Sequence, residues 1–373
     1  MSSGNYCSPK NNNSFTCFSN EDLTKIAEYI STKSTNKLDI PAKFDIHNRK
    51  KLWSDIQENI GNLSKCSADY CLIKNTDIYN LIGKHKVEKL FRPEQPVKWL
   101  KNNTTWLSTI DIRKVMTQYQ DKYSDFQFIG PTPIDFDKRF TQEVCVNNSL
   151  CNFNLETLIN SGKKRIGVIF NLDPHNMSGS HWVSLFIDTN TGGIYFFCSY
   201  GVKPNTQIYD FIKKVWKQGN KLIMNRKINI NNINDQHTVA RRFKMLNSLT
   251  VTVNDSNFFK KNMLVSLGNF DGNNLNLEPT TVNKINNIVN GTIILEKKLP
   301  QDISNYSVIA MKSFRGFYND TRFQFKSTEC GVYSIYFIES FLKGHNYGQI
   351  LSNIINDNEI NKKRNIYYRP HII

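Results

Sequence analysis

Three side chains far apart in the chain are of the types that hydrolyse an acyl bond together. Cys330 begins an apolar run over residues 330–344 that predicts a buried helix ended by Gly344. A thiol at a helix N-terminus faces the positive end of the helix dipole, which favours the nucleophilic thiolate. A lone cysteine is more often a small core residue, so Cys330 becomes a candidate nucleophile only through its companions.

The candidate general base is His181, which stands where the loop 176–180 enters a predicted strand starting at Trp182. A histidine at a strand end is by itself more often structural. Gln324 lies shortly before Cys330, on a segment that could fold back and direct its amide N–H toward the oxygen of a tetrahedral intermediate, beside the backbone N–H of Cys330. Along the chain the histidine comes first, followed by a third site residue, the glutamine and the cysteine. This order excludes a cysteine protease of the papain type, in which the cysteine comes first.

Alternating strands and turns should position the histidine. Apolar runs at 166–171, 182–188 and 194–198 predict buried strands, with a turn at 189–193. If the last two strands pair across that turn, residues 198–200 return beside His181. Asp188 would then lie roughly 23 Å along the strand, at about 3.3 Å per residue, and is a turn residue rather than a site carboxylate.

Helical periodicity dominates both sides of these strands. Apolar stripes within residues 23–30, 52–60 and 78–91 predict a small helical domain over 1–95. The second domain, 96–373, starts with a helix whose capping box is Ser108 and Asp111, and another helix begins near Thr206. We read residues 220–301 as an inserted subdomain with strand-like runs and a helix through Val282, Ile285 and Ile288.

The stretches GSHWVSLFID, IYFFCSYG and FQFKSTECGVYSIYF carry a family resemblance. They resemble the cysteine protease clan that includes adenain and the SUMO-specific proteases, and within it the core polyprotein proteases of African swine fever virus and related large DNA viruses. CSADYC and the WLSTIDI…FIGPTPIDF segment extend the resemblance upstream. It implies an α+β fold, with a mixed central sheet flanked by helices and the nucleophile at the start of a buried helix.

Carried over by position, the resemblance makes Cys330 the nucleophile, His181 the base and then acid, and Gln324 an oxyanion donor. The departure is at the third position, where relatives carry Asp or Asn and this chain has Cys198. Cys198 would orient the imidazole weakly as a thiol and strongly as a thiolate; Ser199, Tyr200 or a backbone carbonyl are the alternatives. A Cys–His pair depends less on such a residue than a serine triad does, so a working enzyme is expected.

The composition indicates which partners, which cellular compartment and which cofactors to expect. Forty-eight Lys and Arg against 32 Asp and Glu give a net charge of +16, which predicts non-specific association with DNA unless the charge reflects codon bias. No stretch is apolar enough for a membrane span or a signal peptide, so an intracellular protein is expected. Eight cysteines without CxxC spacing predict reduced thiols and no metal site, and no cofactor is expected.

Three functions are compatible with these features. The resemblance implies an endopeptidase of a large DNA virus that cuts structural precursor polyproteins after Gly-Gly-like sequences during virion maturation, in the host cytoplasmic viral factory and the virion interior. A deconjugase of SUMO or ubiquitin-like proteins would use the same site and sequence preference. A basic core-packaging protein that retains the fold but little activity is the non-enzymatic alternative.

Overall fold

The computed structural model divides the chain into two compact units, one formed by Met1–Ser124 with Phe323–Ile373 and the other by Asp125–Arg322. The described residues are 6–11, 15–34, 45–60, 69–225, 227–228, 230, 238–271, 274–278, 281–299, 306–353 and 355–371.

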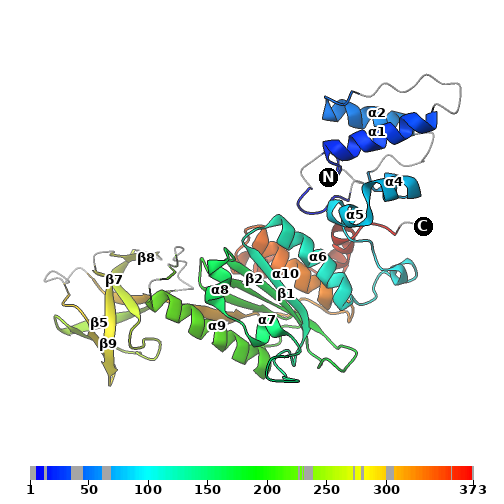
Figure 1. Ribbon diagram of the computed structural model, residues 1–373. Coiled ribbons are helices and arrows are strands. Elements are labelled where there is room, and N and C mark those ends of the chain that lie inside the picture. Colours follow the sequence, from blue (N-terminus) through cyan, green and yellow to red (C-terminus); the bar gives the residue numbers. More distant parts are fainter. Residues whose placement is uncertain are drawn as a thin grey trace. The chain divides into compact units, whose positions relative to one another are not determined.

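The first unit is helical among its described residues. Its elements are α1 (Asn20–Ser34), α2 (Arg49–Ile60), α3 (Asp69–Leu72), α4 (Thr76–Ile82), α5 (Lys84–Leu90), the 3₁₀ helix η1 (Val97–Leu100), α6 (Thr109–Lys122), α10 (Cys330–Leu342), α11 (Tyr347–Ser352), α12 (Asp357–Lys362) and α13 (Arg364–Tyr367). The predicted helices are confirmed, and α1 and α2 lie side by side (Figure 1). The capping box of α6 is present: Ser108 accepts from the Asp111 N–H, and the Asp111 carboxylate accepts from the Ser108 N–H.

The five-stranded sheet of the second unit carries the predicted hairpin. Its strands are ordered β1 (Phe126–Pro133), β2 (Arg165–Asn171), β3 (Trp182–Asp188), β4 (Gly193–Phe197) and β12 (Arg315–Tyr318). β2, β3 and β4 are antiparallel, whereas β1 and β12 pair in parallel with β2 and β4, so the sheet is mixed as expected. The helices of this unit are α7 (Asn148–Cys151), α8 (Leu155–Asn160) and α9 (Thr206–Met224), which contacts β4 and β12.

A second sheet occupies the chain between α9 and β12 (Figure 1). Its strands are β5 (Thr238–Asn247), β6 (Thr250–Val253), β7 (Leu264–Asp271), β8 (Asn274–Leu277), β9 (Asn283–Val289), β10 (Thr292–Leu295) and β11 (Val308–Lys312). Antiparallel pairings run from β5 through β6, β10, β9 and β7 to β11, which pairs again with β5. The sheet therefore closes on itself around an apolar core that includes Val251, Val265 and Ile293.

The prediction of a helix through Val282, Ile285 and Ile288 is wrong, because these residues belong to strand β9 or flank it. Only Ile285 is fully buried, while Val282 is 48% exposed. Asn290 and Gly291, both at positive φ, connect β9 to β10. An Asn-Gly pair between apolar runs is the hairpin signal that outweighs the three-residue spacing.

The prediction of reduced thiols is also wrong for most described cysteines. Cys7 pairs with Cys17 and Cys145 with Cys151. Cys71 is disulfide-bonded as well, and Cys66 lies outside the described residues. The spacing of the cysteines in the sequence does not reveal these pairs, because the fold decides which sulfurs meet. The Cys7 backbone, for example, is held beside Phe91 by a β-bridge.

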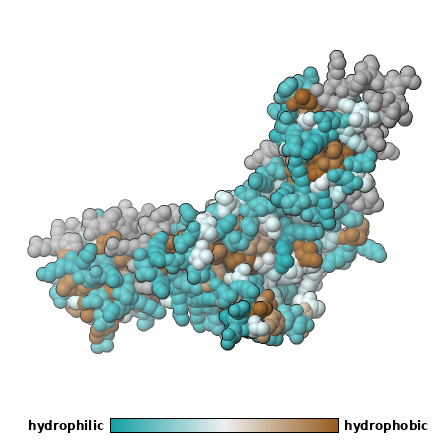
Figure 2. All heavy atoms as spheres, in the orientation of Figure 1, coloured by the Kyte–Doolittle hydropathy of each residue, from teal (hydrophilic) through white to brown (hydrophobic). Residues whose placement is uncertain are grey.

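The visible surface of the described residues is largely hydrophilic, with apolar side chains in separate small areas (Figure 2). Within the described part of the chain, no helix combines the length and apolarity needed to cross a membrane.

Candidate active site

His181 is positioned by the strand pairing that the sequence predicts. It directly precedes β3, and its carbonyl accepts a hydrogen bond from the Leu172 N–H at 2.9 Å, which extends the pairing of β2 with β3. Its side chain is buried, with the residue 7% exposed. Burial lowers the pKa of His181 to about 4, and no carboxylate contributes to this shift among the described residues. The imidazole is therefore neutral at neutral pH.

Cys198 contacts the histidine, as the hairpin geometry predicts. Ser184 pairs with Phe197 across β3 and β4, so Cys198, the residue after β4, returns to the start of β3. The Cys198 sulfur lies 3.4 Å from Nε2 of His181. Burial raises the pKa of the Cys198 thiol, so at neutral pH it is a thiol and not a thiolate. Asp188, by contrast, faces Gly193 at the far end of the hairpin and accepts the Asn190 N–H, which confirms it as a turn residue.

An aromatic ring also holds the imidazole. Tyr200 stacks on His181 with ring centroids 4.4 Å apart and planes 12° from parallel. The Arg322 guanidinium lies 5.3 Å from the Tyr200 ring centroid. The following residue, Gly201, has φ +72°, and a Cβ there would come within 2.8 Å of the Asp320 carbonyl oxygen. Only glycine fits this close approach, which lets the chain turn immediately after Tyr200.

Asn319 is a residue of this region that sequence reasoning missed. Its buried side chain accepts the Cys198 N–H at 2.9 Å and donates to the Cys198 carbonyl at 2.7 Å and to the Thr321 carbonyl at 3.0 Å. This two-way contact fixes the backbone that carries Cys198. No sequence signal marks it, because Asn319 is 121 positions from Cys198 in an Asn-rich chain.

Cys330 and Gln324 lie in the other unit. Cys330 is the first residue of α10, as predicted, and is 1% exposed. Gln324 is fully buried, and one N–H of its amide donates to the Lys326 carbonyl. The site residues thus form two groups, His181 with Cys198 in one unit and Gln324 with Cys330 in the other.

The loop that carries Gln324 is anchored to the helices around it. The Tyr333 hydroxyl of α10 donates to the Phe323 carbonyl at 3.0 Å and to the Ile355 carbonyl at 2.7 Å. The Asp357 carboxylate at the start of α12 accepts the N–H groups of Phe325 and Lys326. No sequence pattern predicted α11 to α13, so this support was not expected.

The two thiols among the described cysteines are Cys198 and Cys330. The other five are disulfide-bonded. The fold therefore keeps sulfur in the thiol form at the two positions that sequence reasoning assigned to the site.

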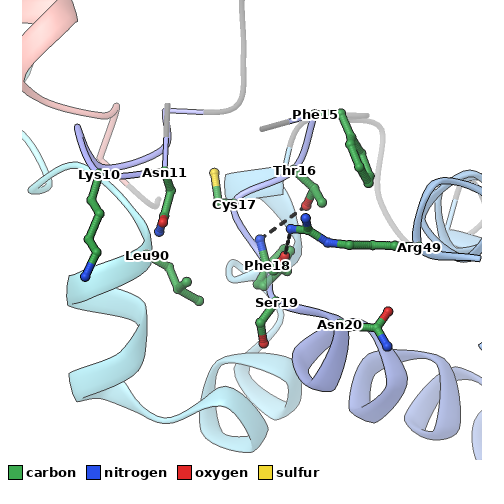
Figure 3. Close-up of a pocket in the computed structure, with 10 residues that line it drawn as sticks. All are labelled: Lys10, Asn11, Phe15, Thr16, Cys17, Phe18, Ser19, Asn20, Arg49 and Leu90. Atoms are coloured by element: carbon green, nitrogen blue, oxygen red, sulfur yellow. Dashed lines mark hydrogen bonds between the residues drawn. The ribbon is translucent and has the colours of Figure 1, made fainter. Parts of the chain in front are cut away.

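The first unit contains a cavity of about 760 Å³ (Figure 3). Its lining includes the basic side chains of Lys10 and Arg49, the first residue of α2, and Asn20 at the start of α1. The Arg49 guanidinium donates to the Phe18 carbonyl at 2.6 Å and lies 5.0 Å from the Phe15 ring centroid. None of the predicted site residues lines this cavity.

No protein-family model matches the chain. A protein of Acanthamoeba polyphaga mimivirus named as a thiol protease is 28% identical over an alignment covering 98% of this chain and 93% of the relative. Two crystal structures of the African swine fever virus protease match with TM-scores of 0.51 and 0.53, at 16% and 15% identity. They cover 100% and 99% of this chain and 98% and 97% of theirs.

The chain is a cysteine peptidase with the fold of the African swine fever virus protease. The solved structures support its fold, and the mimivirus relative supports its enzyme class. Both comparisons are with viral proteins, so the coarse expectation of a viral cysteine protease is confirmed. The roles of the individual site residues in this peptidase stay predictions.

Substitutions at Cys198 should distinguish the effect of its contact with His181 from the effect that a negative charge at this position would have. We expect Cys198→Ala to lower kcat/KM by about 10- to 100-fold, because a neutral thiol orients the imidazole without stabilising its charged form. Cys198→Asp should raise the pKa of His181, since an opposite charge favours the imidazolium. The measurement is kcat/KM against pH, in which the acid limb of Cys198→Asp should lie one unit or more above that of the wild type, to order of magnitude.

The matched control is Cys198→Ser, which keeps a small hydrogen-bonding group and should leave the acid limb in place. A loss of about 10⁴-fold in Cys198→Ala, as large as removing the acid of a serine triad, would contradict the weak-orientation role.

Proposed function

We propose that this cysteine peptidase is an endopeptidase of a large DNA virus that cuts structural precursor polyproteins after Gly-Gly-like sequences during virion maturation. The observation that carries the proposal is the retention of thiols at Cys330 and Cys198 while the other described cysteines form disulfides. A purely structural protein has no need to keep one thiol at a helix N-terminus and the other against a buried, neutral imidazole.

The proposed mechanism assigns one task to each side chain. With Nε2 of His181 directed at Cys198, the proton acceptor is Nδ1, and Nε2–H donates to the Cys198 sulfur. Nδ1 takes the proton of Cys330, the thiolate attacks the carbonyl carbon, and the imidazolium then protonates the leaving amine. In the second half of the cycle water attacks the acyl carbon of the thioester and gives its proton to the imidazole; the C–S bond breaks, the carboxylic acid product leaves and Cys330 regains its proton.

The oxyanion of the intermediate is assigned to the Cys330 backbone N–H and the Gln324 amide. The hydrogen bond to the Lys326 carbonyl fixes the orientation of that amide. Gln324→Glu, which loses both amide donors, should lower kcat on the order of 10²-fold with little change in KM.

A competition between two substrate types tests the proposed substrate class. Purified protein is offered a viral structural precursor and a ubiquitin-like protein fused through Gly-Gly, with Cys330→Ala as the control for contaminating proteases. Cleavage of the precursor at defined sites supports the proposal. Cleavage of the fusion alone would establish a deconjugase instead, and cleavage of neither under reducing conditions would favour the packaging protein.

The net charge of +16 supports a second part of the proposal, that the peptidase associates with DNA without reading its sequence in the viral factory and virion. Binding measured by fluorescence anisotropy should weaken at least tenfold between about 50 mM and about 200 mM salt and be equal for unrelated duplexes. Hydrolysis of a short peptide should not change. Absence of binding at low ionic strength would show that the charge has another origin.

A further inference from the structure

A buried carboxylate directly precedes the candidate nucleophile. Glu329 is the N-cap residue of α10, and its side chain is 2% exposed. The carboxylate makes no capping hydrogen bond to the first turn of the helix. Its Oε2 instead accepts from Nε of Arg364 at 2.9 Å, and its Oε1 accepts from the Asn361 amide at 3.0 Å. The negative charge of Glu329, next to Cys330 in the chain, is thus bound by residues of the C-terminal helices α12 and α13.

Arg364, the first residue of α13, is held as firmly as its partner. Its side chain is also 2% exposed. The guanidinium donates to the Thr105 carbonyl at 2.8 Å and to the Thr328 carbonyl at 3.3 Å, and lies 4.5 Å from the Trp99 ring centroid. Carbonyl groups and an aromatic face on several sides fix the cation at one place.

The charges of this pair act on the adjoining thiol in opposite directions. A carboxylate next to Cys330 disfavours the thiolate and opposes the helix dipole, whereas a guanidinium favours the thiolate. Away from water these interactions are much stronger than at the surface. Because Arg364 neutralises Glu329 locally, the dipole of α10 can act on the thiol with little opposition.

Other titratable groups on and around α10 have partners of their own. Glu339 and Lys343 pair with each other at 2.6 Å, and Glu339 lies about 13 Å along the helix from Cys330 at 1.5 Å per residue. Tyr119 of α6 and Tyr367 of α13 donate to that same Glu339 carboxylate. The Asp357 carboxylate of α12 is bound by the backbone N–H groups of Phe325 and Lys326, and the Tyr333 hydroxyl by two carbonyls.

Three lysines on or beside these helices also have partners. Lys363 lies 5.2 Å from the Tyr336 ring centroid, and Lys362 pairs with Glu359 at the surface of α12. Lys326 donates to the Asn358 side chain. The variants below leave all of these groups unchanged, as they do His181 in the other unit.

We propose that Arg364 is a positioning residue for catalysis, which sets the thiolate fraction of Cys330 by neutralising Glu329. The proposal deepens the proposed function, since it matters for catalysis only if Cys330 is the nucleophile. It also gives the C-terminal helices a chemical task, because α13 supplies the cation that balances the charge at the start of α10.

The test measures ionisation of Cys330 directly. The ultraviolet absorbance of the thiolate is followed against pH in the full chain, as the difference between each protein and its counterpart carrying Cys330→Ala. Glu329→Gln keeps a hydrogen-bond acceptor for Arg364 and leaves the cation unbalanced, so the pKa of Cys330 should fall by about one unit. Arg364→Gln leaves the carboxylate unbalanced, so this pKa should rise by about one unit.

The double variant Glu329→Gln with Arg364→Gln restores local neutrality and should return the pKa of Cys330 to the wild-type value. Circular dichroism identifies any variant that fails to fold. If Arg364→Gln unfolds, Glu329→Gln and the double variant still test the proposal. Loss of packing alone would not shift the pKa of Cys330 in Glu329→Gln and restore it in the double variant.

A titration unchanged in the folded variants, or a rise in Glu329→Gln, would overturn the proposal. The absorbance needs no substrate, so its outcome is independent of whether Cys330→Ala abolishes hydrolysis. The two proposals can therefore fail separately.

Discussion

Replacing Cys330 by alanine should abolish peptide hydrolysis, with a loss in kcat on the order of 10⁵- to 10⁶-fold. Without the sulfur no thiolate can attack the carbonyl carbon, and the oxyanion donors alone give only a small residual rate. Hydrolysis of a precursor-derived peptide and labelling by a vinyl sulfone probe measure the effect, and both should disappear.

The control for this substitution is Cys198→Ala, which removes the other thiol of the described cysteines from an equally buried position, 2% exposed against 1% for Cys330. It should keep probe labelling at Cys330 and lose only about 10- to 100-fold in kcat/KM, far less than Cys330→Ala loses. Thermal unfolding of both variants checks that the fold survives. Hydrolysis by Cys330→Ala above about one hundredth of the wild-type rate would contradict the assignment of the nucleophile.

Removing the imidazole with His181→Ala should lower kcat/KM on the order of 10⁴-fold near neutral pH, because no other group is assigned to accept the thiol proton. The wild-type pH profile carries a second expectation. A base works in its neutral form, and burial holds the pKa of His181 at about 4. Activity should therefore persist as the pH falls below 6 and be lost only near 4, well below the usual value for histidine.

His175 provides the matched control, since it lies six positions before His181 and pairs with Asp135 at 2.6 Å. His175→Gln should leave both kcat/KM and its pH dependence unchanged. An acid limb near 6.5 in the wild type, or activity retained by His181→Ala, would contradict the role of a buried neutral base.

Several features of the site could be predicted because they depend on residues close together in sequence. Alternation and the turn at 189–193 place residues 198–200 beside His181, and the structure confirms this with the Cys198 and Tyr200 contacts. The capping box of α6 and the start of α10 at Cys330 are equally local. Backbone geometry and hydrophobic period suffice for such predictions.

Other features depend on contacts between distant segments, and there the sequence was insufficient or misleading. The helix expected through Ile285 is a strand because β10 and β7 pair with it, and a three-residue apolar spacing does not reveal a partner strand. The cysteines expected to be reduced pair because the fold brings their sulfurs together.

The sequence by itself determined the residue types available for catalysis, the hairpin that turns Cys198 toward His181 and the helix that Cys330 begins. Only the tertiary structure decided how these residues are supported. The amide of Asn319 fixes Cys198, and Arg364 balances Glu329, across 121 and 35 positions of the chain. Hydrophobic periodicity and secondary-structure propensity describe only short stretches of the chain. A buried polar group, by contrast, can have its hydrogen-bond partner anywhere in the sequence, because folding brings distant residues together.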